Sequence, residues 1–117
     1  MRCVEQMIAS QHSICNRYGA EFLGSDFDEK LGIALNVMGN VVPINGLRYK
    51  PENGTCGWYI WAGEGYSDDP DFFVSLHVKH IDEWNPLIRK YLGLGPGWRF
   101  LIADKYEDVW FDQSLLD

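Results

Sequence analysis

The segment 55–61, TCGWYIW, restricts the fold more than any other part of this sequence, because it carries large apolar side chains at most of its positions. Successive side chains of a β-strand point to opposite faces, so Cys56, Trp58 and Ile60 would share one face and Tyr59 and Trp61 the other. A strand that is apolar on both faces is typical of the centre of a sheet that is covered on both sides. The alternative is that a partner molecule covers part of one face.

Two helices are predicted, one before and one after the strand-rich middle of the chain. Apolar residues recur at helical spacing over residues 3–18, and Gly19 follows as a C-terminal cap. A second helix is expected within residues 77–92, where Asn85 is placed to act as the N-cap and Pro86 occupies the first helical position. The glycine-rich stretch GLGPG that follows would end this helix.

An early hairpin is predicted from the alternation of apolar and small or polar residues over 31–37. Gly39 and Asn40 then separate two apolar runs, which is the pattern of a two-residue hairpin turn. The return strand would begin at Val41. Pro43 either places this strand at a sheet edge or ends it, because proline cannot donate to the hydrogen-bond ladder.

A closing hairpin is predicted near the C-terminus, with an alternating strand over 98–103, a turn over 104–107 and a return strand over 109–111. The order of helix, strands, helix and strands lacks the regular alternation of a parallel doubly wound sheet. We therefore expect one α+β domain over residues 1–117. Its mainly antiparallel sheet would have about five to six strands, with an N-terminal helix and a second helix before the closing hairpin.

The charge balance narrows the class of partner. Lys and Arg number 10 and Asp and Glu 17, and the formal net charge of −7 opposes binding to nucleic acid or to an anionic membrane. A basic protein is the complementary partner, although the same charge would also serve solubility alone.

The sequence has no apolar run of membrane-spanning length and no leader-like segment, which predicts a cytoplasmic protein. Its three cysteines lack ligand spacing and are expected to be reduced.

A metal site is the first chemical alternative. His77 and His80 would share one face of a helix, beside Asp82 and Glu83. A pair of histidines at this spacing is a weak signal, because no third histidine and no suitable cysteine lies nearby in the sequence. We therefore expect no metal and no cofactor.

A nucleophilic enzyme is the second alternative. The nucleophile would be Cys56, Ser67 or Ser75, with one of the histidines as its base. Cys56 has no adjacent cation in the sequence to activate its thiol, and neither serine lies in a G-x-S-x-G turn. We therefore predict no catalytic residues and do not expect an enzyme.

Aromatic side chains beside carboxylates form the candidate partner-binding surface. The stretch 61–71 holds two large aromatic residues, four carboxylates and no basic residue, and aromatics rimmed by charge are typical of protein-binding hot spots. Residues 104–117 add a net charge of 1 − 5 = −4. The alternative is a solvated loop. Arg99 is predicted to pair with Asp108 or Asp112 of the closing hairpin, and the alternative for Arg99 is direct contact with the partner. The candidate partner-binding residues are Trp61, Glu64, Tyr66, Asp68, Asp69, Asp71, Asp108 and Asp112.

The segments GWYIWAGE, GWRF and YEDVWFD, together with the earlier LGIALN, resemble small bacterial proteins of the immunity protein 33 family. The resemblance extends over roughly residues 31–116. It implies a non-enzymatic cytoplasmic protein of a polymorphic toxin system, which binds and blocks a toxin delivered by a neighbouring cell. The implied partner is a cognate toxin, and the acidic charge of this chain suits a basic one. The resemblance implies no catalytic residues and no cofactor.

Two other functions stay open on the sequence alone. One is a sensor of a small molecule or peptide, with a pocket lined by Trp58, Trp98 and Trp110. The other, which ranks third, is a hydrolase.

Overall fold

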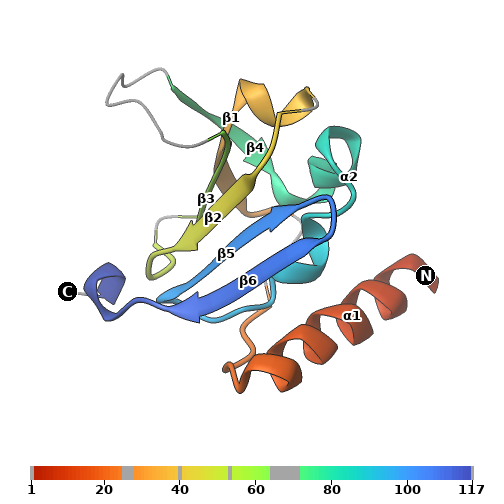
Figure 1. The fold of residues 1–117 in the computed structure, drawn as a ribbon, viewed down its shortest axis with the longest axis vertical. Helices are drawn as coiled ribbons and strands as arrows, with labels where there is room; N and C mark the ends of the chain where they lie inside the picture. The colour runs from red at the N-terminus through yellow and green to blue at the C-terminus, as the bar shows by residue number, and fades with distance from the viewer. Residues whose placement is uncertain (1, 25–27, 40, 53, 64–71, 117) are drawn as a thin grey trace.

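The computed structural model describes residues 2–24, 28–39, 41–52, 54–63 and 72–116 (Figure 1). Within these residues, α1 (Arg2–Tyr18) precedes a sheet of six strands. The strands are β1 (Lys30–Ala34), β2 (Ile44–Arg48), β3 (Thr55–Ala62), β4 (Phe73–His77), β5 (Trp98–Ala103) and β6 (Tyr106–Phe111). The shorter helical elements are η1 (Leu35–Met38), η2 (Val78–His80), α2 (Ile81–Trp84), η3 (Arg89–Tyr91) and η4 (Gln113–Leu116).

The strands are arranged in the order β4-β1-β3-β2-β5-β6. β1 and β3 run parallel, and the other described neighbours are antiparallel. The fold is therefore α+β with a mainly antiparallel sheet, which confirms the expected class. The N-terminal helix and the closing hairpin of β5 and β6 are also confirmed.

The central position predicted for the aromatic strand is confirmed, because β3 lies between β1 and β2. On one face, Cys56, Trp58 and Ile60 are completely buried in the main core. Helical elements cover this face: α1 contributes Ile14 and Cys15, and α2 and η3 add further buried side chains. Figure 1 shows α1, in red to orange, beside the blue β5–β6 hairpin.

The opposite face of the sheet carries a smaller apolar cluster. Ala34, Leu47 and Trp61 form it with Leu115, and Phe72 and Phe73 pack against them. Among the elements that the structure describes, η4 packs on this face through Leu115. We call this side of the sheet, which carries Tyr59 and Trp61, the open face.

The predicted early hairpin is wrong. β1 ends at Ala34, and residues 35–38 form the turn η1, in which Val37 points into the core while Leu35 and Met38 are exposed. β1 pairs with β3 and β4 rather than with β2. Asn40, the second residue of the predicted turn, lies outside the described residues.

The return strand predicted to begin at Val41 is wrong as well, because residues 41–43 form no strand. β2 begins at Ile44, immediately after Pro43, and lies between β3 and β5. Because the proline precedes the strand, its missing N–H removes no bond from the ladder. Both neighbours of β2 therefore pair with it along its length.

The second helix is shorter and earlier than predicted. α2 ends at Trp84, so Asn85 is its C-cap rather than the N-cap of a following helix. The side-chain oxygen of Asn85 accepts a hydrogen bond from the Leu87 N–H at 3.0 Å, which favours a turn in place of a regular helix. The chain then reaches η3, whose Arg89 carbonyl accepts a bond from the Gln11 side chain of α1 at 2.9 Å.

Arg48 connects distant segments of the core, although its side chain is only 1% exposed. Its Nε donates to the Cys56 carbonyl at 2.8 Å, and its Nη1 donates to the carbonyls of Leu23 at 2.6 Å, Leu94 at 2.7 Å and Leu92 at 3.2 Å. Burial lowers the pKa of this guanidinium. The carbonyl oxygens replace water around the charge, as a buried cation requires.

Candidate partner-binding face

The open face presents a row of side chains across the sheet. The register pairs Tyr59 of β3 with Leu47 of β2, Leu47 with Arg99 of β5, and Arg99 with Trp110 of β6. Neighbouring strands lie about 4.8 Å apart, so the row extends over roughly 14 Å. Tyr59 is 38% exposed and Trp110 is half-buried. An aromatic side chain therefore lies at each end of the row, with an arginine beside one of them.

A second row runs parallel to the first. Trp61 pairs with Asn45, Asn45 with Leu101, and Leu101 with Asp108. Trp61 is only 4% exposed, whereas Asp108 is exposed. The second row thus contains a buried tryptophan and an accessible carboxylate three strands away.

Aromatic rings gather at the β3 end of both rows. The Tyr59 ring makes edge contacts with Tyr49 and Phe73, at centroid distances of 5.6 and 5.4 Å, and Phe73 makes a similar contact with Trp61 at 6.3 Å. Gly32 makes room for this arrangement, because a Cβ atom there would lie 2.7 Å from the Tyr59 ring. The rings and Leu47 surround a shallow depression of about 230 Å³.

Arg99 lies at the other end of the first row. Its Nη1 forms an ion pair with Asp112 Oδ2 at 3.1 Å, and its guanidinium carbon lies 5.3 Å from the centroid of the Trp110 ring. The expected pairing of Arg99 with Asp112 is confirmed. Hydrogen bonds from the Ser114 hydroxyl and from Arg99 lower the pKa of Asp112, so this carboxylate is ionised and engaged in the hairpin.

The family model for the Imm33-like domain matches residues 10–112. The chain belongs to the Imm33-like family. No curated protein and no solved structure matches it. Immunity-protein families such as this one are generally not catalytic, which agrees with the family resemblance of the sequence. In the described part of the chain, every helix is too short or too polar to cross a bilayer.

The site residues predicted for this Imm33-like domain differ from one another in burial and in contacts. Trp61 forms the buried floor of the aromatic group, Asp108 is exposed on the open face, and Asp112 is held by Arg99 and Ser114. The structure therefore brings Trp61 and Asp108 onto one face of the sheet but not into contact. The predicted residues Glu64, Tyr66, Asp68, Asp69 and Asp71 lie outside the described residues.

The partner-binding residues predicted from the sequence did not include Tyr59 or Trp110. Strand alternation already placed Tyr59 on the same face as Trp61. Trp110 pairs with Arg99, so it lies on the open face, whereas Trp58 and Trp98 pack on the main core. A single pocket lined by Trp58, Trp98 and Trp110 is therefore wrong.

The histidines His77 and His80, considered above as metal ligands, lie near each other, and His80 contacts an exposed glutamate. His80 Nδ1 lies 2.6 Å from Glu83 Oε2, and the rings of His77 and His80 are 6.3 Å apart. Among the residues that the structure describes, no group of three or more metal-ligating side chains comes together.

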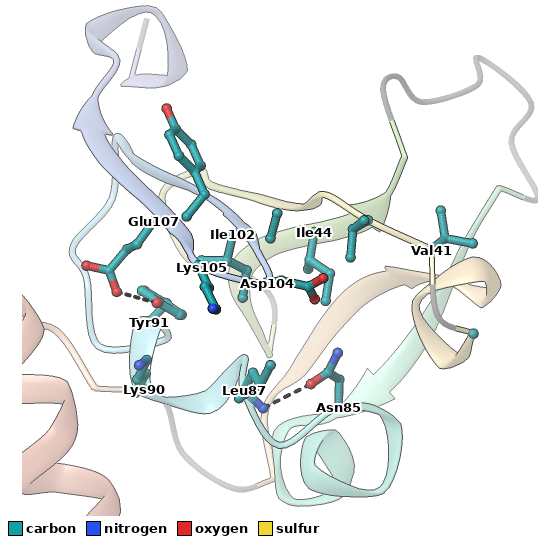
Figure 2. Close-up of a pocket in the computed structure, with 14 residues that line it drawn as sticks. Val41, Ile44, Asn85, Leu87, Lys90, Tyr91, Ile102, Asp104, Lys105 and Glu107 are labelled. Atoms are coloured by element: carbon teal, nitrogen blue, oxygen red, sulfur yellow. Dashed lines mark hydrogen bonds between the residues drawn. The ribbon is translucent and has the colours of Figure 1, made fainter.

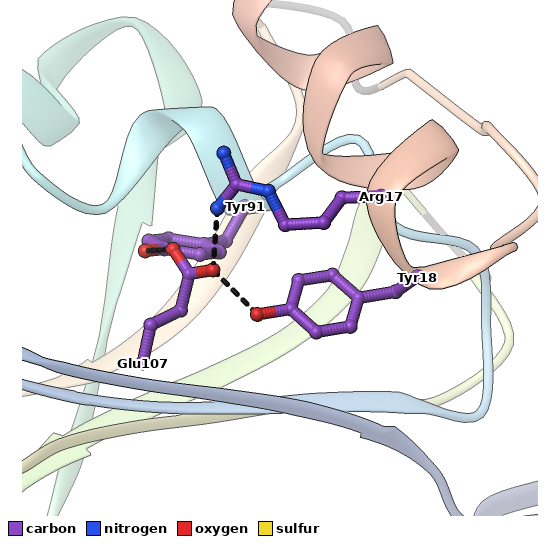
Figure 3. A network of polar contacts seen from close by, with 4 residues as sticks. All are labelled: Arg17, Tyr18, Tyr91 and Glu107. Atoms are coloured by element: carbon purple, nitrogen blue, oxygen red, sulfur yellow. Dashed lines mark hydrogen bonds and ion pairs between the residues drawn. The ribbon is translucent and has the colours of Figure 1, made fainter.

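Glu107 forms a polar network on the helical side of the sheet (Figure 3). Its Oε1 accepts a hydrogen bond from the Tyr91 hydroxyl at 2.5 Å, and its Oε2 accepts from the Tyr18 hydroxyl at 2.5 Å and from Arg17 at 2.7 Å. Burial alone would raise the pKa of Glu107, but the three donors outweigh it and lower the pKa. Burial and this hydrogen bond raise the pKa of Tyr91 far above its ordinary value. The network therefore joins α1 and η3 to β6.

Proposed function

We propose that this protein is an immunity protein that binds a cognate toxin through the open face and blocks it without catalysis. The observation that carries this proposal is the first row of the open face, where Tyr59, Arg99 and Trp110 are aligned on one surface. Tyrosine, tryptophan and arginine are the residue types that dominate protein-binding hot spots. The family membership supports the same reading.

The charge of the chain favours a basic toxin. The net charge is −7, and Asp108 is exposed on the open face without an ion pair among the described residues. An accessible carboxylate beside aromatic anchors would speed association with a basic surface through long-range attraction. The same charge disfavours nucleic acid and anionic membranes as partners, and the proposed site of action is the cytoplasm.

The acidic stretch after β3 remains part of the proposed surface. Glu64, Asp68, Asp69 and Asp71 follow directly on the strand that carries Tyr59 and Trp61. In this proposal Trp61 supports the aromatic group from below, because its ring is buried against Phe73. Tyr59 and Trp110 contact the toxin directly.

The test compares variants of the open face for binding to the cognate toxin, identified by co-purification with this protein from its native host. Tyr59→Ala and Trp110→Ala should each weaken binding about 30-fold, which corresponds to about 2 kcal/mol for a hot-spot residue. They should also reduce the survival of cells that express the toxin. Asp108→Lys should slow association strongly at low salt and only mildly at high salt.

Leu87→Ala is the control, because Leu87 is an exposed apolar residue on the helical side of the sheet, away from the open face. Thermal melting of each variant reports whether it stays folded. The proposal is wrong if folded Tyr59→Ala, Trp110→Ala and Asp108→Lys proteins bind and protect like the native protein.

A further inference from the structure

A groove of about 590 Å³ lies on the helical side of the sheet, away from the open face (Figure 2). The closing hairpin forms one wall, Gly39, Val41 and Val42 form the second, and residues 85–91 form the third. Buried side chains of Ile44, Ile102 and Tyr91 make its floor. This volume lies within the range of about 300–1,000 Å³ that is usual for small-molecule sites.

Exposed apolar side chains converge on this groove. Val41, Val42 and Leu87 line it, and their exposed fractions are 44%, 51% and 61%. They come from two separate segments of the chain, so their meeting is a product of the fold and not of one apolar run. A ligand with an apolar body would cover all three side chains and remove their surface from water.

Nitrogen donors border the same apolar surface. Lys90 and Lys105 line the groove, and neither forms an ion pair among the described residues. In Figure 2 the Lys105 amino group points into the groove, and the amide nitrogen of Asn85 points into it from the opposite wall. These groups are suited to hold the oxygen atoms of an anionic group.

The carboxylates of the groove cancel only part of the charge of these lysines. Glu107 is already engaged by Tyr91, Tyr18 and Arg17, so its charge is balanced within the protein. Asp104 is exposed at the hairpin turn and opposes the two lysines. With Glu107 balanced by Arg17, the groove retains an excess of one positive charge from Lys90, Lys105 and Asp104.

We propose that this groove binds a small organic anion, consisting of an apolar body and one carboxylate or similar acidic group. The apolar body would lie on the side chains of Val41, Val42 and Leu87. The acidic group would contact Lys90, Lys105 and the Asn85 amide. This site is separate from the open face, so its ligand does not compete with the proposed toxin for the same residues.

The probe for this site is 8-anilinonaphthalene-1-sulfonate, an apolar body with one anionic group, titrated into the folded protein by calorimetry and fluorescence. We expect saturable binding of one probe per chain and displacement by decanoate. The double variant Lys90→Gln/Lys105→Gln should weaken binding about fivefold or more, because two charged contacts with the acidic group are lost. Asp104→Asn should strengthen it, since the opposing charge is removed.

Matched variants locate the probe. Lys50→Gln, which removes an exposed lysine outside the groove, should leave binding unchanged. Leu87→Ser should weaken both this probe and its neutral analogue N-phenyl-1-naphthylamine, whereas the lysine variants should weaken only the anionic one. Tyr59→Ala should have no effect, because Tyr59 lies on the open face.

Three results would overturn the proposal. The first is native-like binding by the double lysine variant. The second is loss of binding in Tyr59→Ala, which would place the probe on the open face. The third is failure of decanoate to displace the probe when an acidic, apolar peptide does displace it, which would make the occupant a protein segment instead of a small anion.

Discussion

Replacing Glu107 with glutamine tests whether one carboxylate holds α1 and η3 against the sheet. The carboxylate accepts hydrogen bonds from Tyr91, Tyr18 and Arg17, which lie on two different elements. Tyr91 is only 2% exposed, so its hydroxyl has little access to water if the carboxylate is lost. Glutamine keeps the length of the side chain and one carbonyl oxygen but removes the charge.

The size of the effect follows from the two tyrosine donors. A hydrogen bond to a charged group contributes about 1.5–3 kcal/mol to the free energy of unfolding. Because glutamine can keep part of one such bond, we expect Glu107→Gln to lower the free energy of unfolding by about 2 kcal/mol. Arg17 is largely exposed and is left out of this figure. An unfolding entropy of about 2.1 cal/mol/K per residue gives about 0.25 kcal/mol/K for 117 residues, so the melting temperature should fall by about 8 °C.

The difference in stability between the native protein and Glu107→Gln should depend on pH, with a definite sign. The folded-state pKa of Glu107 is lowered, so its contribution to stability is fully present above the unfolded pKa of about 4.3 and is lost as the pH falls through the folded value. The gap between the native protein and Glu107→Gln should therefore be widest near neutral pH. It should narrow as the pH falls below about 4.

Thermal and urea unfolding of four proteins measure this directly: native, Glu107→Gln, Tyr91→Phe and the double variant. The double variant should lose less stability than the sum of the single variants, by about 1 kcal/mol or more. Asp108→Asn is the control, because it removes the neighbouring carboxylate, which points to the opposite face of the sheet. A Glu107→Gln protein that melts like the native one at neutral pH, or additive losses in the double variant, would refute this account of the network.

Two further substitutions test the packing of the core by thermal unfolding. Arg48→Lys should lower the free energy of unfolding by about 2 kcal/mol or more, because an ammonium group cannot reproduce the hydrogen bonds that Arg48 donates from Nε and Nη1. Native-like melting of this variant would show that these hydrogen bonds do not stabilise the protein. Gly57→Ala should lower the free energy of unfolding more than Gly24→Ala does, because Gly57 has a φ of +92° and a Cβ there would lie 2.1 Å from the Tyr49 carbonyl oxygen. Equal losses of stability in the two variants would contradict this explanation.

Local patterns in the sequence were sufficient to predict the elements whose stability is local. β3 and the closing hairpin follow directly from alternation, which also limited the partner of Arg99 to two carboxylates, of which Asp112 is the one it pairs with. The N-terminal helix follows from its apolar spacing and its terminal glycine. Each of these features depends on residues that are close in sequence.

The errors occurred where distant contacts override local preference. The alternation over 31–37 continues past Ala34, but Val37 turns into the core, and the chain leaves the sheet there. Asn85 is a good N-cap in isolation, yet the segment after it is fixed by contacts with α1, including the bond from Gln11 to the Arg89 carbonyl. No local pattern contains this information.

The candidate site was predictable only in part. The alternation over β3 placed Tyr59 and Trp61 on one face, but it could not show that Trp61 would be buried by Phe73. Trp110 became relevant only through the pairing of β5 with β6, which puts it beside Arg99. Glu107 gave no signal in the sequence, because its three donors come from α1 and η3.

The strand order also has a consequence for the way in which this sheet assembles. β2 with β3 and β5 with β6 are neighbours in both the chain and the sheet, so each pair can close a short loop early in folding. β1 pairs in parallel with β3 and has to wait for that strand, and β4 pairs with β1. We therefore expect the sheet to grow outward from β3, with β4 joining only after β1, the strand with which it pairs.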